Sequence, residues 1–293
     1  MTIAMGFLTP EGFVVGADST TTFTTDDGNH YYNHAQKIFE VGQNSSLTIA
    51  TWGLGSLHTV SYRHLIADLG DLFQRSAPAS VEDAAKAWAD LFWEAYSEGP
   101  RKPSIVRCQE LHAKPAHEPA APNATSRTAD EELEYASLKQ NLVVGFCIGG
   151  NVASDRTPRA HSMIFDPLSA APVPQPVPLG APQFWGVPNV IGRLLIGCDA
   201  RIPKAILDSG KWSGTEKELL ELLIAHRLQH QTTMPIREAI DFTYSCIHAT
   251  IKALKFSNLS QICGGPIEVA VITADRGFRW VRHKELYSAI SEV

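Results

Sequence analysis

The stretch that decides the fold is residues 2–19, TIAMGFLTPEGFVVGADS. Two short apolar runs, residues 2–8 and 12–17, flank a turn at residues 9–12 that contains proline and glycine. Proline and glycine favour tight turns, and short apolar runs bounded by turn residues are typical of strands. The sequence therefore predicts a β-hairpin at the start of the chain.

Thr2 could acquire the chemistry of a nucleophile. Methionine aminopeptidase normally removes Met1 when the next residue is small, as Thr2 is. The product would carry a free α-amine and a hydroxyl on one residue. An α-amine has a reference pKa of about 7.7–8.0, so a useful fraction is neutral near pH 7 and can accept the hydroxyl proton. A Met-Thr start is common, so this interpretation depends on the residues that follow.

Those residues carry a family resemblance. The run T-I-A-M-G-F-x-x-x-x-G-F-V-V-G-A-D-S resembles the opening of proteasome β-subunits and of their bacterial relative, the peptidase of the two-component ATP-dependent protease. That family opens with a catalytic threonine, a hairpin with a turn glycine, and a small-small-Asp-Ser signature. Asp18 lies sixteen positions after Thr2, as in the family, and Gly12 matches the turn glycine. The resemblance implies that Thr2 is the nucleophile and Asp18 a site carboxylate.

A second block extends the resemblance: Q-K-I-F-E-V, followed after a turn by L-T-I-A-T-W-G-L-G-S. It implies that Lys37 is the active-site lysine, although Lys37 follows Asp18 by nineteen positions, three more than usual. Gly53 best matches the glycine whose backbone N–H forms the oxyanion hole, with Trp52 as the alternative if the turn aligns one residue earlier. A cation beside a threonine hydroxyl lowers the hydroxyl pKa, and a preformed N–H stabilises the tetrahedral oxyanion.

The C-terminal part resembles the family more loosely. The segment N-L-S-Q-I-C-G-G-P-I-E-V-A-V-I-T resembles the family's helix exit, double glycine and final hairpin. The family usually has an aspartate and a serine where this chain has Ser260 and Cys263. Both side chains can hydrogen-bond, but neither supplies the negative charge that helps to orient the N-terminal amine. The departure concerns catalytic support and not the fold.

The resemblance implies an α+β fold, a four-layer αββα sandwich of two antiparallel sheets flanked by helices, in a single domain over residues 1–293. It implies a divergent bacterial-type N-terminal-nucleophile hydrolase of the threonine-peptidase kind, which acts on peptides or small amides. Self-assembly into rings is implied as well, and an ATPase partner is left unidentified. No cofactor and no metal are expected.

The composition fits a soluble globular protein: 293 residues, of which 44% are hydrophobic and 19% charged. A net charge of −6 gives no electrostatic reason to expect nucleic acid or an anionic membrane as a partner. No apolar run approaches the roughly 20 residues of a membrane span, and the N-terminus has no basic leader. The five cysteines are scattered without a C-x-x-C pair, which favours reduced thiols and a cytoplasmic location.

Apolar spacing predicts the remaining elements. Helices are expected after the glycine turn at residues 53–56 and in four further segments, about 81–96, 190–207, 216–229 and 236–254. Strands are expected at 37–41, 47–52, 142–148, 161–165, 267–272 and 276–282, with a short helix from residue 283.

Three segments show no such periodicity. Residues 18–36 form a polar stretch rich in Thr, Asp and Asn. Residues 98–138 are polar and rich in Pro and Ala, which predicts a flexible insertion. Residues 167–184 are proline-dense and predict an extended surface connector.

Two other functions stay open. A non-catalytic structural subunit or scaffold could keep the fold without the chemistry, and the replacements at Ser260 and Cys263 motivate that alternative. A small-molecule amidohydrolase could use the insertion at 98–138 as a substrate lid. It would cleave small amides but not peptides.

Overall fold

The computed structural model describes residues 2–25, 28–117, 125–199, 201–228, 231–258 and 262–284. The chain divides into two compact units, each with its own sheet and core. The first unit comprises the residues up to Ile38, Pro178–Val271 and the residues from Arg279 on; the second comprises Phe39–Val177 and Ile272–Phe278.

The first unit is built on a five-stranded sheet with the order β10-β1-β2-β11-β12. The predicted N-terminal hairpin is confirmed, because β1 and β2 pair antiparallel with Thr9 opposite Gly12. Both strands are buried along their whole length, which explains why their sequences are apolar without alternation. The bounds are β1 (Ile3–Thr9), β2 (Gly12–Ala17), β10 (Gln183–Gly186), β11 (Glu268–Thr273) and β12 (Arg276–Arg282).

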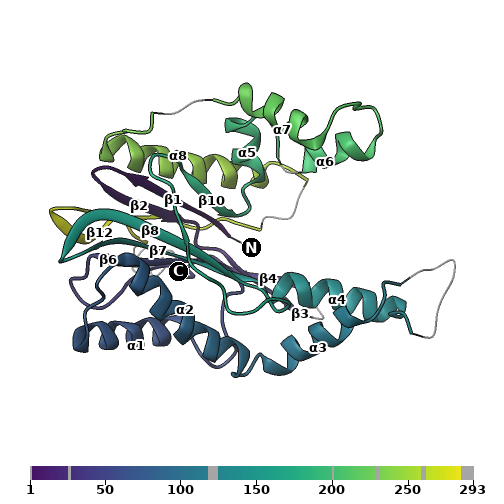
Figure 1. Ribbon diagram of the computed structural model, residues 1–293, viewed down its shortest axis with the longest axis horizontal. Coiled ribbons are helices and arrows are strands. Elements are labelled where there is room, and N and C mark those ends of the chain that lie inside the picture. The colour runs from purple at the N-terminus through teal and green to yellow at the C-terminus, as the bar shows by residue number, and fades with distance from the viewer. Residues whose placement is uncertain are drawn as a thin grey trace, which may run out of the picture. The chain divides into compact units, whose positions relative to one another are not determined.

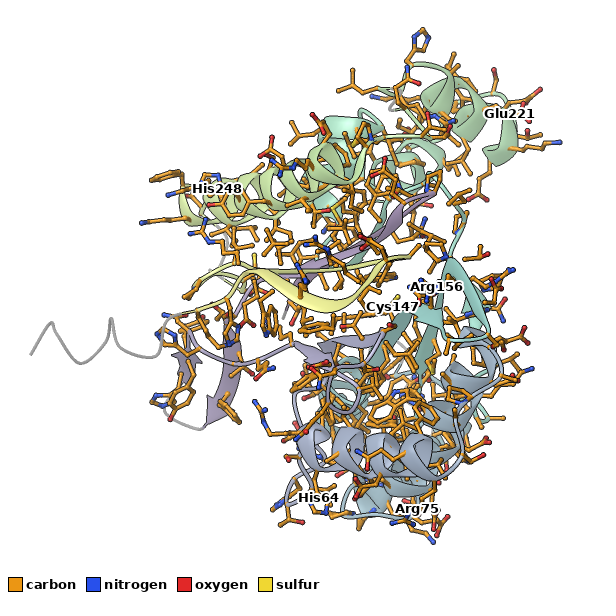
Figure 2. All side chains as sticks on the ribbon, turned by 90° about the vertical axis from the view of Figure 1, so that its left-hand side faces the viewer. His64, Arg75, Cys147, Arg156, Glu221 and His248 are labelled. Atoms are coloured by element: carbon orange, nitrogen blue, oxygen red, sulfur yellow. The ribbon has the colours of Figure 1, made fainter. Side chains whose placement is uncertain are left out.

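Helix α8 covers this sheet along β1 and β2 (Figure 1). Its apolar face, including Ile247 and Ile251, packs on Ile3 and Val14 of the strands. Figure 2 shows side chains filling the space between α8 and the sheet, with the exposed His248 on α8. The helices of this unit are α5 (Asn189–Leu195), α6 (Arg201–Asp208), α7 (Glu216–Ala225) and α8 (Ile236–Lys255).

The single helix predicted at 190–207 is wrong: α5 and α6 are separate helices. Between them Gly197 adopts φ +87°, a conformation that ends a helix and that glycine accepts without steric cost. Asp199 follows, and its carboxylate binds the guanidiniums of Arg193 and Arg201, one from each helix. The apolar periodicity of the two helices runs on across this break, so it did not reveal the glycine's role.

The polar stretch at 18–36 contains a second, smaller hairpin. Strands β3 (Thr21–Thr25) and β4 (Gly28–Tyr32) pair antiparallel as a two-stranded sheet. Threonine and aromatic residues favour strands, and Phe23 packs edge-on against Tyr32 with ring centroids 5.5 Å apart. Both rings are at least half exposed, so hydrophobic burial gives little signal here.

The second unit contains a five-stranded sheet with the order β5-β6-β7-β8-β9. Helices α1 and α2 lie side by side along one face of it (Figure 1). His64 and Arg75 of α1 are exposed and point away from the sheet (Figure 2). The bounds are β5 (Ile38–Glu40), β6 (Leu47–Gly53), β7 (Val144–Val152), β8 (Asp155–Phe165), β9 (Gln175–Pro176), α1 (Tyr62–Arg75) and α2 (Val81–Ser97).

Aromatic side chains form the core of this second unit. Phe92 of α2 is fully buried, and its ring lies 4.5 Å from that of Phe146 on β7 and 4.6 Å from that of Phe165 on β8. Trp88 and Tyr62 add edge-on contacts to the same cluster. The large apolar area that these rings bury holds α1 and α2 against the sheet.

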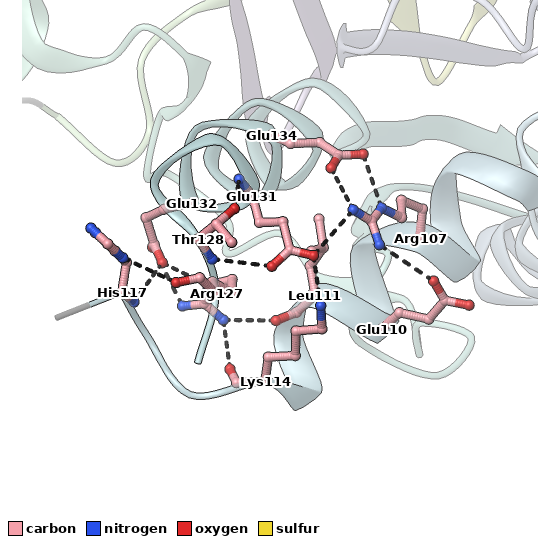
Figure 3. Close-up of polar contacts among 10 residues, drawn as sticks. All are labelled: Arg107, Glu110, Leu111, Lys114, His117, Arg127, Thr128, Glu131, Glu132 and Glu134. Carbon is pink, nitrogen blue, oxygen red and sulfur yellow. Dashed lines mark hydrogen bonds and ion pairs between the residues drawn. The ribbon is translucent and has the colours of Figure 1, made fainter. Parts of the chain in front are cut away.

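Residues 98–138, where the sequence predicts a flexible insertion, contain two helices, α3 (Lys102–Ala113) and α4 (Ala129–Asn141). Figure 3 shows the contacts that join them. Arg127 donates to the carbonyls of Leu111 and Lys114 and pairs with Glu132. These helices bury few apolar residues, so the apolar pattern of the sequence does not indicate them. A capping box marks the start of α4.

The predicted α+β class, two antiparallel sheets flanked by helices, is confirmed. Within the part of the chain that the structure describes, no helix is both long enough and apolar enough to cross a membrane. The helix predicted from residue 283 falls mainly on residues outside the described ranges.

Candidate functional site

Asp18 is the centre of a buried polar cluster in the first unit. It follows the last residue of β2, is fully buried, and uses both carboxylate oxygens. Oδ1 accepts from the backbone N–H of Ile3 at 3.1 Å and from Lys37 Nζ at 2.6 Å. Oδ2 accepts from the backbone N–H groups of Thr20 at 3.1 Å and Gly264 at 2.9 Å. The four donors compensate this buried carboxylate for the hydration that it loses on burial.

This network fixes the position of Thr2. The N–H of Ile3, which belongs to the peptide bond after Thr2, shares the oxygen of Asp18 that holds the Lys37 ammonium. The N–H of Asp18 in turn donates to the Ile3 carbonyl at 3.1 Å. Thr2 is itself 4% exposed. The nucleophile predicted from the sequence therefore stands one peptide unit from an ion pair that is closed to solvent.

Lys37 is held on two sides. Its ammonium binds Asp18 and also donates to the carbonyl of Thr20 at 2.6 Å, and only 7% of its side chain is exposed. Burial lowers the pKa of Lys37 from its ordinary value of 10.5, and the Asp18 carboxylate opposes that shift. Lys37 is therefore an oriented ammonium, and the positive charge of an ammonium can stabilise a developing alkoxide.

Cys263 lies in the same cluster. It is fully buried, and the residue after it donates its N–H to Asp18. Burial, reinforced by the neighbouring Asp18 carboxylate, raises the pKa of the Cys263 thiol to about 12. The thiol is therefore neutral and supplies no negative charge. Ser260, the other predicted support, lies outside the described residues.

Gly53, the predicted oxyanion donor, belongs to the second unit and ends β6. It adopts φ +86°, and a Cβ there would overlap the carbonyl oxygen of Val143. The following N–H, from Leu54, donates to that same carbonyl at 2.9 Å. The position thus requires glycine for its backbone conformation. Its role as oxyanion donor, and the Trp52 alternative, stay predictions.

Sequence reasoning missed three residues of the cluster. Thr20 contributes its N–H to Asp18 and its carbonyl to Lys37, and Gly264 contributes an N–H. Gly186, with φ +82°, lies against Thr2 so closely that a Cβ would overlap the Thr2 carbonyl oxygen. Backbone groups leave no side-chain signature in a sequence, although glycine at residue 186 marks a close approach once β10 is paired with β1.

Among the described residues, no group of three or more His, Cys, Asp or Glu side chains is placed to hold a metal ion. The site cluster consists instead of one carboxylate, one ammonium, one thiol and backbone amides. These groups can orient a nucleophile and stabilise charge during acyl transfer.

No family model and no curated protein matches the sequence. Solved structures do match. One is an Anbu (Gly-1) mutant from Hyphomicrobium sp. strain MC1, at 13% identity, with 98% of this chain and 91% of that chain covered and a TM-score of 0.51. Another is Anbu, described as the ancestral β-subunit, from Yersinia bercovieri, at 10% identity, with coverage of 98% and 90% and a TM-score of 0.47.

The family prediction from the sequence is therefore wrong in one respect. The structure with a TM-score of 0.51 is an Anbu protein, and Anbu proteins are proteasome-like and form a distinct family. The motif that carried the resemblance is a nucleophile followed by a hairpin and an aspartate, and this arrangement does not separate one family of the fold from another. At 13% identity the likeness shows the fold alone: a proteasome-related fold of the N-terminal-nucleophile type.

Proposed function

We propose that this protein is an amide-bond hydrolase whose nucleophile is the hydroxyl of Thr2, released as the N-terminal residue of the mature chain. One observation carries the proposal. A single buried oxygen of Asp18 joins the backbone beside Thr2 to the Lys37 ammonium. A surface role for these residues would not require a fully buried carboxylate with four donors.

In the first half of the reaction, Thr2 Oγ attacks the carbonyl carbon of the substrate amide. The hydroxyl proton passes to the neutral α-amine of Thr2, directly or through water, and a C–O bond forms. The tetrahedral intermediate then collapses. The C–N bond breaks, the α-amine returns the proton to the leaving nitrogen, and an ester to Thr2 remains. In the second half the amine takes a proton from water, and the water oxygen bonds to the ester carbon. The bond from that carbon to Thr2 Oγ then breaks, the amine returns its proton to Oγ, and the acid is released.

Lys37 and Asp18 have different electrostatic roles in this reaction. The Lys37 ammonium stabilises the negative charge that develops on Thr2 Oγ as its proton leaves. Asp18 keeps this ammonium oriented at 2.6 Å and offsets part of the penalty for burying it. The Gly53 N–H is proposed as donor to the substrate oxyanion, an interaction worth roughly 2.7–4 kcal/mol in other hydrolases.

Peptides are the proposed substrates and self-assembly into rings is the proposed quaternary arrangement. The proteasome-like fold of the Anbu structure supports both proposals. An ATPase partner is left unidentified.

One observation favours a second candidate, a non-catalytic subunit. The thiol of Cys263 is neutral, so it provides no negative charge to orient the amine of Thr2. If the residues that remain cannot position the amine, the fold would act as a scaffold.

Hydrolysis of a fluorogenic peptide mixture and of small amides tests these candidates with four proteins. Wild type should turn over, Thr2→Ser should keep part of the rate, and Thr2→Ala should lose at least about a thousandfold in kcat. Thr59→Ala, which changes an exposed threonine, is the matched control and should behave as wild type. No turnover by wild type would favour the scaffold, whereas equal, non-zero rates for wild type and Thr2→Ala would show that Thr2 is not the nucleophile. Turnover of small amides alone would indicate the amidohydrolase.

A further inference from the structure

The first unit buries a second carboxylate that the proposed mechanism does not use. Glu268 is the first residue of β11 and is fully buried. Its neighbours Ile267 and Val269 pack in the apolar core with α8. Since successive side chains of a strand point to opposite faces, Glu268 points to the face of the sheet away from α8. A buried carboxylate in such a place needs a compensating charge.

Two residues that follow β12 supply that compensation. His283 Nδ1 lies 2.7 Å from Glu268 Oε1. Lys284 Nζ lies 3.1 Å from Oε2, within ion-pair distance although the groups are not aligned for a hydrogen bond. Only 7% of the Lys284 side chain is exposed, against 39% for His283. Lys284 and Glu268 therefore form a buried ion pair whose partners depend on each other.

The sheet brings this pair to the same end as the Thr2 cluster. Strand β11 lies between β2, which leads into Asp18, and β12, which leads into Lys284. Ser19 ties the chain after β2 to the chain before β11, because its N–H donates to Gly264 and its hydroxyl donates to the carbonyl of Pro266 at 2.7 Å. Pro266 is two residues before Glu268. One end of the sheet thus carries two lysine–carboxylate pairs.

The two lysines are paired with carboxylates at the same end of one sheet, so the charge of each disfavours the charge of the other. The positive charge of Lys284 is one of the effects that lower the pKa of Lys37, after burial and against the attraction of Asp18. In the mature chain the amine of Thr2 would be a further neighbour.

We propose that Lys284, held in the interior by Glu268, is a positioning residue of the Thr2 site that acts through Lys37. The Lys284 ammonium adds a second positive charge at this end of the sheet. The Glu268 carboxylate partly neutralises that charge and so weakens its repulsion of the Lys37 ammonium. The pair thereby sets the pH range in which Lys37 is a cation. The catalytic part of this inference rests on the proposed function, whereas the coupling between the two lysines does not.

The coupling is measured directly by NMR titration of the ε-carbons in protein labelled at lysine, with the Lys37 signal assigned from a Lys37→Met sample. Lys284→Met removes a repelling cation, so the titration midpoint of Lys37 should rise. Glu268→Gln leaves that cation unbalanced, so the midpoint should fall. In the double variant the titration midpoint of Lys37 should lie between those of the two single variants. The double variant also provides a folded protein if a single variant does not fold, because a neutral pair replaces a buried ion pair at little cost in stability. Lys211→Met, at an exposed lysine of the same unit, should change nothing.

Opposite signs for the two single variants distinguish electrostatic coupling from general damage, which would move both in one direction. The proposal would be overturned if Lys284→Met left the titration midpoint of Lys37 unchanged, or if the two single variants shifted that midpoint in the same direction. The alkaline limb of the peptide-hydrolysis profile should follow the NMR midpoints across the variants. If wild type is inactive while the midpoints still move in opposite directions, the coupling holds and the proposed catalytic function fails.

Discussion

At the scale of single residues, the site rests on one carboxylate with four donors. Thr2, Asp18, Lys37 and Cys263 could be predicted from the sequence because each is a side chain at a recognisable distance from a motif. The structure brings these four together in the first unit. Their roles in catalysis stay predictions. The backbone donors around Asp18 could not be predicted, because any residue supplies an N–H and only the fold decides where it points.

The protonation of Lys37 predicts the pH dependence of activity. Activity requires a charged Lys37 and a neutral amine on Thr2. Since burial lowers the pKa of Lys37 from 10.5, the ammonium is lost, and activity with it, at a pH below that value. On the acid side activity should fall as the amine is protonated, near its reference pKa of about 7.7–8.0. A pH–rate profile of kcat for wild type should therefore be bell-shaped.

Lys37→Arg is the matched variant for this profile. Arginine stays charged over the whole range, so the alkaline limb should disappear even if the rate is lower. An alkaline limb that persists unchanged in Lys37→Arg would show that another group titrates there.

At the scale of elements, the sequence predicted some boundaries of helices and strands and missed others. The β1–β2 hairpin was predictable because proline and glycine mark its turn between two apolar runs. The break between α5 and α6 was not, because apolar periodicity continues on both sides of Gly197. The β3–β4 hairpin was missed for another reason: its strands are polar and exposed, so they show no burial pattern.

Gly186 provides a prediction about the position of Thr2. Gly186 and Gly197 have similar dihedrals, φ +82° and +87°, but a Cβ at Gly186 would overlap the Thr2 carbonyl whereas a Cβ at Gly197 would meet nothing within 4 Å. Gly197→Ala should lose about 1 kcal/mol of unfolding free energy and keep its activity. Gly186→Ala should also displace Thr2 and lower kcat about a hundredfold. Denaturation curves and peptide hydrolysis of both variants check this, and equal activities would contradict it.

The α3–α4 pair depends on Arg127 more than on its exposed ion pairs. Arg127 has 7% of its side chain exposed and donates to two backbone carbonyls, whereas Arg107, 36% exposed, binds only carboxylates (Figure 3). Arg127→Ala removes the side-chain donor to the carbonyls of Leu111 and Lys114, so hydrogen exchange in α3 and α4 should become faster. Arg107→Ala should leave it nearly unchanged, because exposed ion pairs contribute little. Faster exchange in Arg107→Ala than in Arg127→Ala would contradict this account.

At the scale of the whole molecule, each unit has a core of its own. The second unit relies on packed rings around Phe92, which is fully buried. Phe92→Ala should lower the free energy of unfolding by about 3–5 kcal/mol, through lost burial and the cavity left behind. Phe256→Ala, at a phenylalanine that is 79% exposed, is the control and should stay within about 0.5 kcal/mol of wild type. Urea denaturation followed by fluorescence measures both. Similar losses would mean that the cluster is not the stabilising core.

The comparison with solved structures also shows what a short sequence motif can and cannot predict. The opening residues predicted the fold class, and the fold is that of a proteasome-like protein. They placed the chain in the wrong family, because a short motif reflects the geometry of a nucleophile and a hairpin.

The central claim, that Thr2 is a working nucleophile, is tested most directly by intact-mass spectrometry after incubation with a peptide epoxyketone. Such a reagent needs both the hydroxyl and the free amine of an N-terminal threonine. The account predicts a chain that begins at Thr2 and carries one adduct, in wild type and Thr59→Ala but not in Thr2→Ala. A chain that begins at Thr2 without an adduct, or one that keeps Met1 and stays unmodified, would contradict the claim.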